Sequence, residues 1–210
     1  AMKATRRARA LVQQILSFSH QRPTERRPLD LNMIVKEVAK LLRASMPSTI
    51  EIEIVPDARP LVVYADTTQI HQVLMNLCTN AYHAMRDKGG KLTVALDTGV
   101  YEASCDVPAP GVYARLTVQD TGEGMEDSLL QRIFDPYFTT KPKGEGTGMG
   151  LAVVHGIVKS HGGFIDVYSE VGKGRKFQVF LPSSTSKAVA ADAAAKRTSL
   201  PRGDGELVLV

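Results

Sequence analysis

Asp120-Thr121-Gly122-Glu123-Gly124 decides the fold together with a second glycine-rich stretch, Gly144-Glu145-Gly146-Thr147-Gly148-Met149-Gly150. Glycine is the usual residue where the backbone needs a positive φ or a close approach, so either stretch alone would suit an ordinary turn. Asp120, however, ends a predicted strand, where its carboxylate can accept a hydrogen bond from an exocyclic amine. The second stretch precedes a predicted helix, where backbone N–H groups can bind phosphates. Together the two stretches predict the two ends of a purine nucleotide site.

The familiar nucleotide fingerprints do not match this chain. Glycine at every second position from Gly144 to Gly150 fits neither the GxxxxGK[ST] of a P-loop nor the GxGxxG of a dinucleotide fold. The stretch also follows a predicted strand, helix and loop, and it does not open the first βα turn of a parallel sheet. The mismatch with both fingerprints narrows the choice of nucleotide-binding fold.

Composition indicates a globular protein. With 210 residues, of which 43% are hydrophobic and 23% charged, the chain can form one core with appendages. Cys78 and Cys105 have neither metal-binding nor disulfide-framework spacing, so we interpret both as free thiols in a reducing cytoplasm.

There is no apolar run of the roughly 20 residues that a membrane span needs, and no signal segment. We expect a cytoplasmic location without membrane contact by these residues, which is compatible with a membrane-anchored full-length protein.

The net charge of +4 is uneven: residues 1–27 hold seven Lys or Arg residues and one Glu, a net +6, so the rest of the chain carries −2. A basic arm can bind nucleic acid, and salt-dependent retention on DNA would test that alternative. Apolar residues at helical spacing, including Leu11, Val12 and Ile15, instead favour an amphipathic helix. Such a helix is too isolated to fold alone, so it needs a partner helix from a second copy or from an upstream segment. We therefore expect no nucleic-acid partner.

Hydrophobic periodicity predicts the order of the other elements. Asp30 is a candidate N-cap for a helix that ends before Pro47, and Asp66 to Gln69 reads as a capping box for a helix that stops at Gly89. The remaining elements are helices at 128–134 and 150–161 and strands at 50–54, 62–64, 92–96, 112–120, 164–168 and 177–181. Because strands and helices do not strictly alternate, we predict an α+β two-layer sandwich. It has a mixed, mostly antiparallel sheet with helices on one face and the other face largely open to solvent.

Asn76 and Asn80 lie four residues apart on the longest predicted helix, so their side chains project from one face. Asparagine is a mediocre helix former because it tends to bond its own backbone. The pair has two interpretations. They are exposed or internally satisfied amides, or they are oxygen ligands for a hard cation and donors to phosphate.

Four boxes of this sequence resemble one family. Leu74-Met75-Asn76-Leu77-Cys78-Thr79-Asn80-Ala81 is similar to the N-box of the histidine kinase, gyrase, heat-shock chaperone and mismatch-repair ATPases. Asp120 to Gly124 resembles the first glycine box, Ile133 to Lys141 the F-box, and Gly146 to Leu151 the second glycine box. The match covers about residues 29–182 in the family's order. It implies a Bergerat-type ATP-binding fold, and the F-box resembles sensor histidine kinases most.

The resemblance implies ATP and Mg²⁺ as cofactors. It implies that Asp120 accepts the adenine amine, that Asn80 ligates Mg²⁺, and that Asn76 and Lys141 take catalytic roles toward the phosphates. His83 would also face the phosphates, although a surface histidine is an equal alternative. The other implied nucleotide-binding positions are Gly122, Gly124, Met125, Thr140, Gly146, Thr147, Gly148, Met149, Gly150 and Leu151.

The implied reaction is in-line transfer of the ATP γ-phosphoryl group to a histidine on a helical dimerisation hairpin. Residues 1–28 would hold the second helix of that hairpin, with 5–22 contacting the acceptor helix and a homodimer partner. The first helix is absent, and His20 is followed by Gln-Arg-Pro rather than by the expected acidic residue. We therefore expect this chain to bind ATP without phosphorylating itself.

The remaining domains follow from the same resemblance and from composition. Residues 29–182 would form the ATP-binding catalytic domain, and 183–202 a linker rich in Ser, Ala, Lys and Arg. Residues 203–210 resemble the first strand of a receiver domain, as in a hybrid kinase. The implied partner is therefore a receiver domain or a response regulator.

Two other functions remain open. A nucleotide-gated interaction module would bind ATP without transferring it, and Arg175 favours such a variant because the family usually has threonine there. An ATPase of the gyrase and chaperone branch is disfavoured by Asn76, since an amide cannot act as the general base for water.

Overall fold

The computed structural model describes residues 25–104, 107–141 and 146–184. In chain order its elements are β1 (Arg27–Asp30), α2 (Leu31–Ser45), β2 (Ile50–Val55), β3 (Val62–Ala65), α3 (Thr67–Met85), β4 (Gly90–Tyr101), β5 (Gly111–Asp120), α4 (Asp127–Leu130), α5 (Gly150–Ser160), β6 (Phe164–Glu170) and β7 (Gly174–Pro182). The hairpin helix expected at 5–22, the linker beyond residue 184, the receiver-like end and Cys105 lie outside the described residues.

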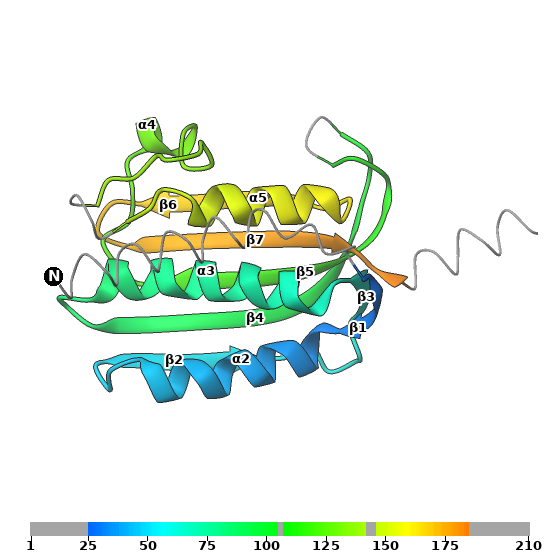
Figure 1. The fold of residues 1–210 in the computed structure, drawn as a ribbon, viewed down its shortest axis with the longest axis horizontal. Coiled ribbons are helices and arrows are strands. Elements are labelled where there is room, and N and C mark those ends of the chain that lie inside the picture. The colour runs from blue at the N-terminus through cyan, green and yellow to red at the C-terminus, as the bar shows by residue number, and fades with distance from the viewer. Residues whose placement is uncertain (1–24, 105–106, 142–145, 185–210) are drawn as a thin grey trace, which may run out of the picture.

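A five-stranded sheet in the order β2-β4-β5-β7-β6 forms one layer. The helices α2, α3 and α5 lie side by side across one face of it (Figure 1). The pairs β4–β5, β5–β7 and β6–β7 are antiparallel, and β2 pairs with β4 in parallel. The predicted α+β sandwich with a mixed, mostly antiparallel sheet is therefore confirmed.

A second, two-stranded sheet pairs β1 with β3 in an antiparallel arrangement. β1 was not predicted, because Arg27-Pro28-Leu29-Asp30 is too short to show an alternating apolar pattern. A β-bridge from Val63 to Ser183 ties this small sheet to the end of β7.

The two predicted helix starts have the expected caps. The Asp30 carboxylate accepts a hydrogen bond from the backbone N–H of Asn32 at 3.0 Å, and Asp66 accepts one from the N–H of Gln69 at 3.0 Å. The reciprocal half of the predicted capping box is missing, since the side-chain oxygen of Gln69 is buried without a partner among the described residues. α3 therefore begins with a single cap.

The core fills the space between the three long helices and the sheet. Its largest fully buried side chains include Leu31, Leu74, Leu77 and Leu92. Cys78 lies among them with 0% exposure and is a free thiol, as predicted. Burial raises the pKa of this thiol to about 12, so it packs as a small apolar group.

Part of the second sheet face departs from the expected open surface. Phe164 and Phe180 stack there with ring centroids 4.2 Å apart, and Tyr101 and Tyr113 pack edge-on against Phe164. Val107 from the β4–β5 connection is buried in the same cluster. A loop without recognised function thus covers one end of this face.

α4 is shorter than the helix predicted at 128–134. After Leu130 the chain continues as turns, with the N–H of Arg132 bonded to the carbonyl of Leu129 and that of Asp135 to the carbonyl of Arg132. These are i to i+3 bonds, which suit short turns rather than a continuing α-helix. They place Ile133, which is buried, against the core.

No helical segment within residues 25–104, 107–141 and 146–184 combines the length and the apolar character that crossing a bilayer requires.

We expect the stability of the domain to fall as the pH drops below about 6.5, with His161 contributing. Burial lowers the pKa of His161, and the charge of Arg26 adds to this effect, whereas the hydrogen bond that its Nδ1 donates to the Ile157 carbonyl at 2.8 Å and the charge of Asp66 offset only part of it. Its Nε2 accepts a hydrogen bond from the N–H of Asp66 at 3.2 Å, which only the neutral ring can do. The unfolded chain then takes up the proton first, so the free energy of unfolding decreases as the pH falls. Urea unfolding at pH 7.5, 6.5 and 5.5 measures this decrease.

A His161→Gln variant is the comparison, since it removes the titrating ring. Its pH dependence over the same range should be flatter. An equally steep decrease in the variant would show that other groups, such as His155, whose pKa burial also lowers, account for the effect.

Candidate functional site: a cavity beside α3

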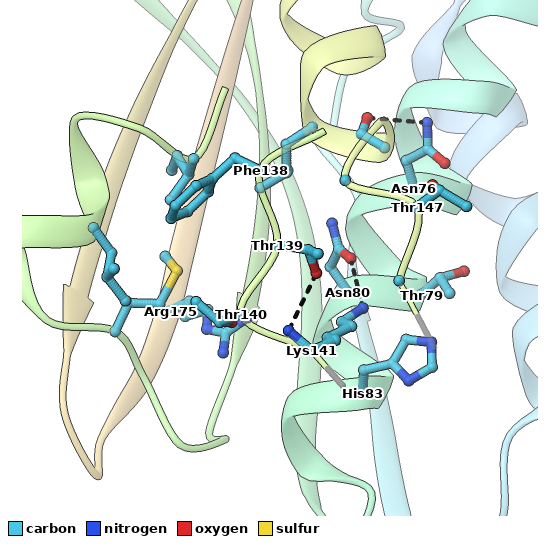
Figure 2. Close-up of a pocket in the computed structure, with 17 residues that line it drawn as sticks. Asn76, Thr79, Asn80, His83, Phe138, Thr139, Thr140, Lys141, Thr147 and Arg175 are labelled. Carbon is cyan, nitrogen blue, oxygen red and sulfur yellow. Dashed lines mark hydrogen bonds between the residues drawn. The ribbon is translucent and has the colours of Figure 1, made fainter. Parts of the chain in front are cut away.

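A cavity of about 240 Å³ lies between α3, the segment after β5 and the loop that leads to α5. We call it the α3 cavity. Figure 2 shows Asn76, Asn80 and His83 along its α3 wall, with Arg175 on the opposite side and Lys141 between them. The sequence-predicted residues that line it are Asn76, Asn80, His83, Met125, Thr140, Lys141, Gly146, Thr147, Gly148, Gly150 and Leu151.

The α3 wall follows from helical spacing. Positions 76, 80 and 83 are one turn apart, so their side chains share a face, while Leu77 and Cys78 point into the core. The Asn76 amide Nδ2 donates a hydrogen bond to the carbonyl of Gly150 at 3.3 Å. This contact joins the cavity wall to the first residue of α5.

Lys141 meets Asn80 across the cavity. The Lys141 Nζ donates a hydrogen bond to Asn80 Oδ1 at 3.3 Å (Figure 2). The Thr139 hydroxyl accepts a hydrogen bond from the Lys141 backbone N–H at 3.2 Å, which stabilises the turn that carries the lysine. The amide oxygen of Asn80 is therefore directed at a cationic group.

The donor set fits one kind of metal site. Among residues 25–104, 107–141 and 146–184 there is no cluster of three or more His, Cys, Asp or Glu side chains that could hold an ion alone. Mg²⁺ often binds through one or two protein oxygens together with substrate phosphates and water. The Asn80 oxygen, already in contact with an ammonium group, suits that arrangement.

The loop before α5 depends on Gly148. Its φ is 65°, and an added Cβ would lie 2.3 Å from the carbonyl carbon of Tyr137. The Tyr137 N–H donates to the Gly148 carbonyl at 3.0 Å, and Tyr137 itself has a φ of 67°. No described side chain caps α5 at Met149, so the first N–H groups of the helix remain available to an anion.

We expect Gly148→Ala to lower the free energy of unfolding by about 1–3 kcal/mol, because the substitution forces a positive φ and a backbone clash. Gly156→Ala is the matched control. Gly156 lies inside α5 with nothing within 4 Å of an added Cβ, and alanine should stabilise the helix by about 0.5–1 kcal/mol. Chemical denaturation of both variants tests the contrast, and equal effects would contradict it.

Asp120 lies at the end of β5 with 3% exposure, and it does not line the α3 cavity. It lines a shallow groove at the edge of the sheet instead, which we call the Asp120 groove. Its Oδ1 accepts a hydrogen bond from the Gly122 N–H at 2.9 Å. Burial raises the pKa of this carboxyl, and the Gly122 bond and the charge of Arg175 offset only part of that rise.

Gly122, Gly124 and Met149 also lie outside the cavity lining. An added Cβ at Gly122 would lie 2.6 Å from the Ala84 carbonyl oxygen, and one at Gly124 would lie 2.1 Å from the Glu170 carbonyl oxygen. The two glycines therefore allow the chain after β5 to pass closely between α3 and the β6–β7 turn. Asp120 itself is placed by the sheet, where it pairs with Leu92 on β4 and Arg175 on β7.

Sequence reasoning missed some of the lining. Thr79 lies on the same face of α3 as Asn76 and His83, so helical spacing alone could have found it. Arg175 was noted only as a departure from the family pattern. Three more lie inside the F-box but were not predicted as site residues, and one has no sequence signal and reaches the cavity through the fold: Ile133, Phe138 and Thr139, and Leu129.

Comparisons with known proteins agree with this geometry. The family described as "Histidine kinase-, DNA gyrase B-, and HSP90-like ATPase" matches residues 65–185. Sensor kinase CckA of Brucella abortus (strain 2308) is 39% identical over 193 residues, which is 89% of this chain and 20% of CckA. The chain thus spans about a fifth of that relative's length.

Two solved structures share the fold. ShkA, solved in complex with AMPPNP, is 25% identical with a TM-score of 0.62, and the match covers 76% of this chain and 31% of ShkA. ThkA, solved in complex with the response regulator protein TrrA, is 27% identical with a TM-score of 0.66, over 89% of this chain and 50% of that chain. The chain therefore belongs to the histidine kinase-, DNA gyrase B- and HSP90-like ATPase family, and it carries the ATP-binding catalytic domain of a sensor histidine kinase.

Proposed function

We propose that this chain binds ATP with Mg²⁺ in the α3 cavity and transfers the γ-phosphoryl group to a histidine on a helical hairpin. The observation that carries the proposal is the contact of Lys141 Nζ with Asn80 Oδ1 in a cavity that also reaches the N-terminus of α5. A cation, an oxygen ligand and free backbone N–H groups converge there. A triphosphate with its metal needs this combination.

Each polar group has a distinct role in this proposal. Asn80 would hold Mg²⁺, which neutralises charge on the phosphates during transfer. Lys141 would leave the Asn80 oxygen and donate to the γ-phosphate as a point charge. Asn76 would keep α5 in place through its bond to the Gly150 carbonyl, so that the helix N-terminus faces the phosphates.

Asp120 would recognise the purine base at the other end of the site. One carboxylate oxygen already accepts the Gly122 N–H, which leaves the other for the adenine amine. Guanine presents a carbonyl at the corresponding position, and a carboxylate would repel it. The proposed site therefore prefers ATP over GTP.

The lining favours transfer to a protein acceptor over hydrolysis. The described residues around the α3 cavity include no aspartate or glutamate that could deprotonate water. The Asn76 amide donates a hydrogen bond and cannot take up a proton. We therefore propose a kinase rather than a hydrolase.

Calorimetry with a non-hydrolysable ATP analogue, with and without Mg²⁺, tests the binding step. A separately purified acceptor hairpin and γ-labelled ATP then test transfer, with the chain alone as the control. Acid-labile label on the hairpin supports the kinase. Binding of ATP without label on the hairpin would instead identify a nucleotide-gated interaction module. Steady release of phosphate would support the function of an ATP hydrolase.

We also propose that a receiver domain or a response regulator accepts the phosphoryl group next. The structural relative ThkA was solved together with a response regulator, which supports this class of partner. Loss of label from the phosphorylated hairpin when a receiver is added would test this step.

A further inference from the structure

Arg175 lies between the two halves of the proposed nucleotide site. It lines both the α3 cavity and the Asp120 groove, whereas Asp120 lines only the groove. In the sheet, Arg175 on β7 is the direct antiparallel partner of Asp120 on β5. Directly paired residues project from the same face, so the arginine side chain stands beside the carboxylate and faces the cavity.

The guanidinium group of Arg175 is weakly held in this position. Its Nη2 donates one hydrogen bond to the Gly124 carbonyl at 3.2 Å, and its Nε is buried without a partner among the described residues. A buried donor without an acceptor is unfavourable. The bond to Gly124 is therefore the main contact that must break when the side chain leaves.

Asp120 has little exposed surface, and Arg175 stands between it and the cavity. The residue is 3% exposed, and a ligand in the α3 cavity meets Arg175 but not Asp120 in the lining. A purine whose amine is to reach Asp120 must displace the guanidinium.

We propose that Arg175 gates the purine subsite: it covers Asp120 when no nucleotide is bound and moves aside when the base enters. This inference rests on the proposed ATP-binding function. Only the open fraction of molecules can bind, so the gate lowers the apparent affinity for ATP.

The direction in which nucleotide affinity changes when Arg175 is removed distinguishes a gate from a simple electrostatic attraction. Removing a positive charge near a triphosphate should weaken binding if attraction were the main role of Arg175. Removing a gate should strengthen binding. Adenosine sharpens the distinction, since it has no phosphates for the arginine to attract.

Calorimetry of Arg175→Thr with a non-hydrolysable ATP analogue and with adenosine tests the gate. We expect about tenfold tighter binding of both ligands than in the unaltered chain, because one charged hydrogen bond no longer has to break. Arg43→Thr is the matched control, as it makes the same substitution at an exposed position on α2 that lines neither the α3 cavity nor the Asp120 groove. Its affinities should stay unchanged.

Equal or weaker binding by folded Arg175→Thr would overturn the gate and leave the ATP-binding proposal standing. If neither the unaltered chain nor any folded variant binds the analogue, ATP binding fails and the gate fails with it. A structure of the unaltered chain with the analogue bound is a test that does not depend on the folding of a variant. Arg175 must then no longer donate to Gly124, and a retained bond beside a base that contacts Asp120 would refute the gate.

Discussion

Asp120→Asn is expected to weaken the binding of ATP by about 100-fold while it raises the unfolding temperature. The Gly122 N–H already occupies one oxygen of the side chain. In the variant that oxygen is the only acceptor, and the amide NH₂ group then faces the adenine amine, donor against donor. Loss of a charged hydrogen bond together with an unpaired donor accounts for the estimated size.

The gain in stability follows from the pKa of the carboxyl. Because burial raises that pKa, the ionised form is less favourable in the fold than in the unfolded chain. At neutral pH the substitution removes this cost, so the variant should melt at a higher temperature. The advantage should shrink as the pH falls toward the pKa, where Asp120 itself becomes protonated.

Calorimetry and thermal melting at two pH values measure both effects. Asp87→Asn is the control, because it makes the same change in charge at an exposed position after α3. A variant that binds ATP normally would remove Asp120 from the purine site. A variant that melts earlier at neutral pH would contradict the direction of the pKa shift.

Asn80→Ala should lower the rate of phosphoryl transfer to an added hairpin by about 10³-fold, because the metal loses its protein ligand. The affinity for ATP should also lose its dependence on Mg²⁺. The fold should change little, since the side chain is only part-buried and its oxygen accepts a hydrogen bond from Lys141 on the cavity side.

Thr68→Ala is the matched control for this variant, as Thr68 is exposed on the first turn of the same helix. Single-turnover transfer at several Mg²⁺ concentrations distinguishes the outcomes. If Asn80→Ala keeps a transfer rate that depends on Mg²⁺, the metal is held elsewhere. Equal losses in both variants would indicate damage to α3 rather than removal of a ligand.

The sequence predicted the elements that are long and strongly periodic. The structure contains the predicted amphipathic stripes of α2 and α3, the caps at Asp30 and Asp66, and the alternation in β5. These features depend on residues close in the chain, so pattern alone is sufficient. β1 and the turns after α4 were missed because tertiary contacts decide such short segments.

The residues of the candidate site likewise include some that the sequence could predict and some that it could not. Asn76 and Asn80 could be paired from their spacing, because a helix fixes their common direction. Arg175 shows what spacing cannot provide: its residue type was visible as a departure, but its place between Asp120 and the cavity depends on the pairing of β5 with β7. Contacts between distant strands carry no local signature.

The order of the strands has a consequence for the synthesis of this chain. β7 comes last among the described strands, yet it lies between β5 and β6 inside the sheet (Figure 1). While the ribosome is still making residues 174–182, β5 exposes an unpaired edge and β6 has no neighbour. A nascent chain stopped before that point would expose the unpaired edges of β5 and β6 to chaperones and proteases.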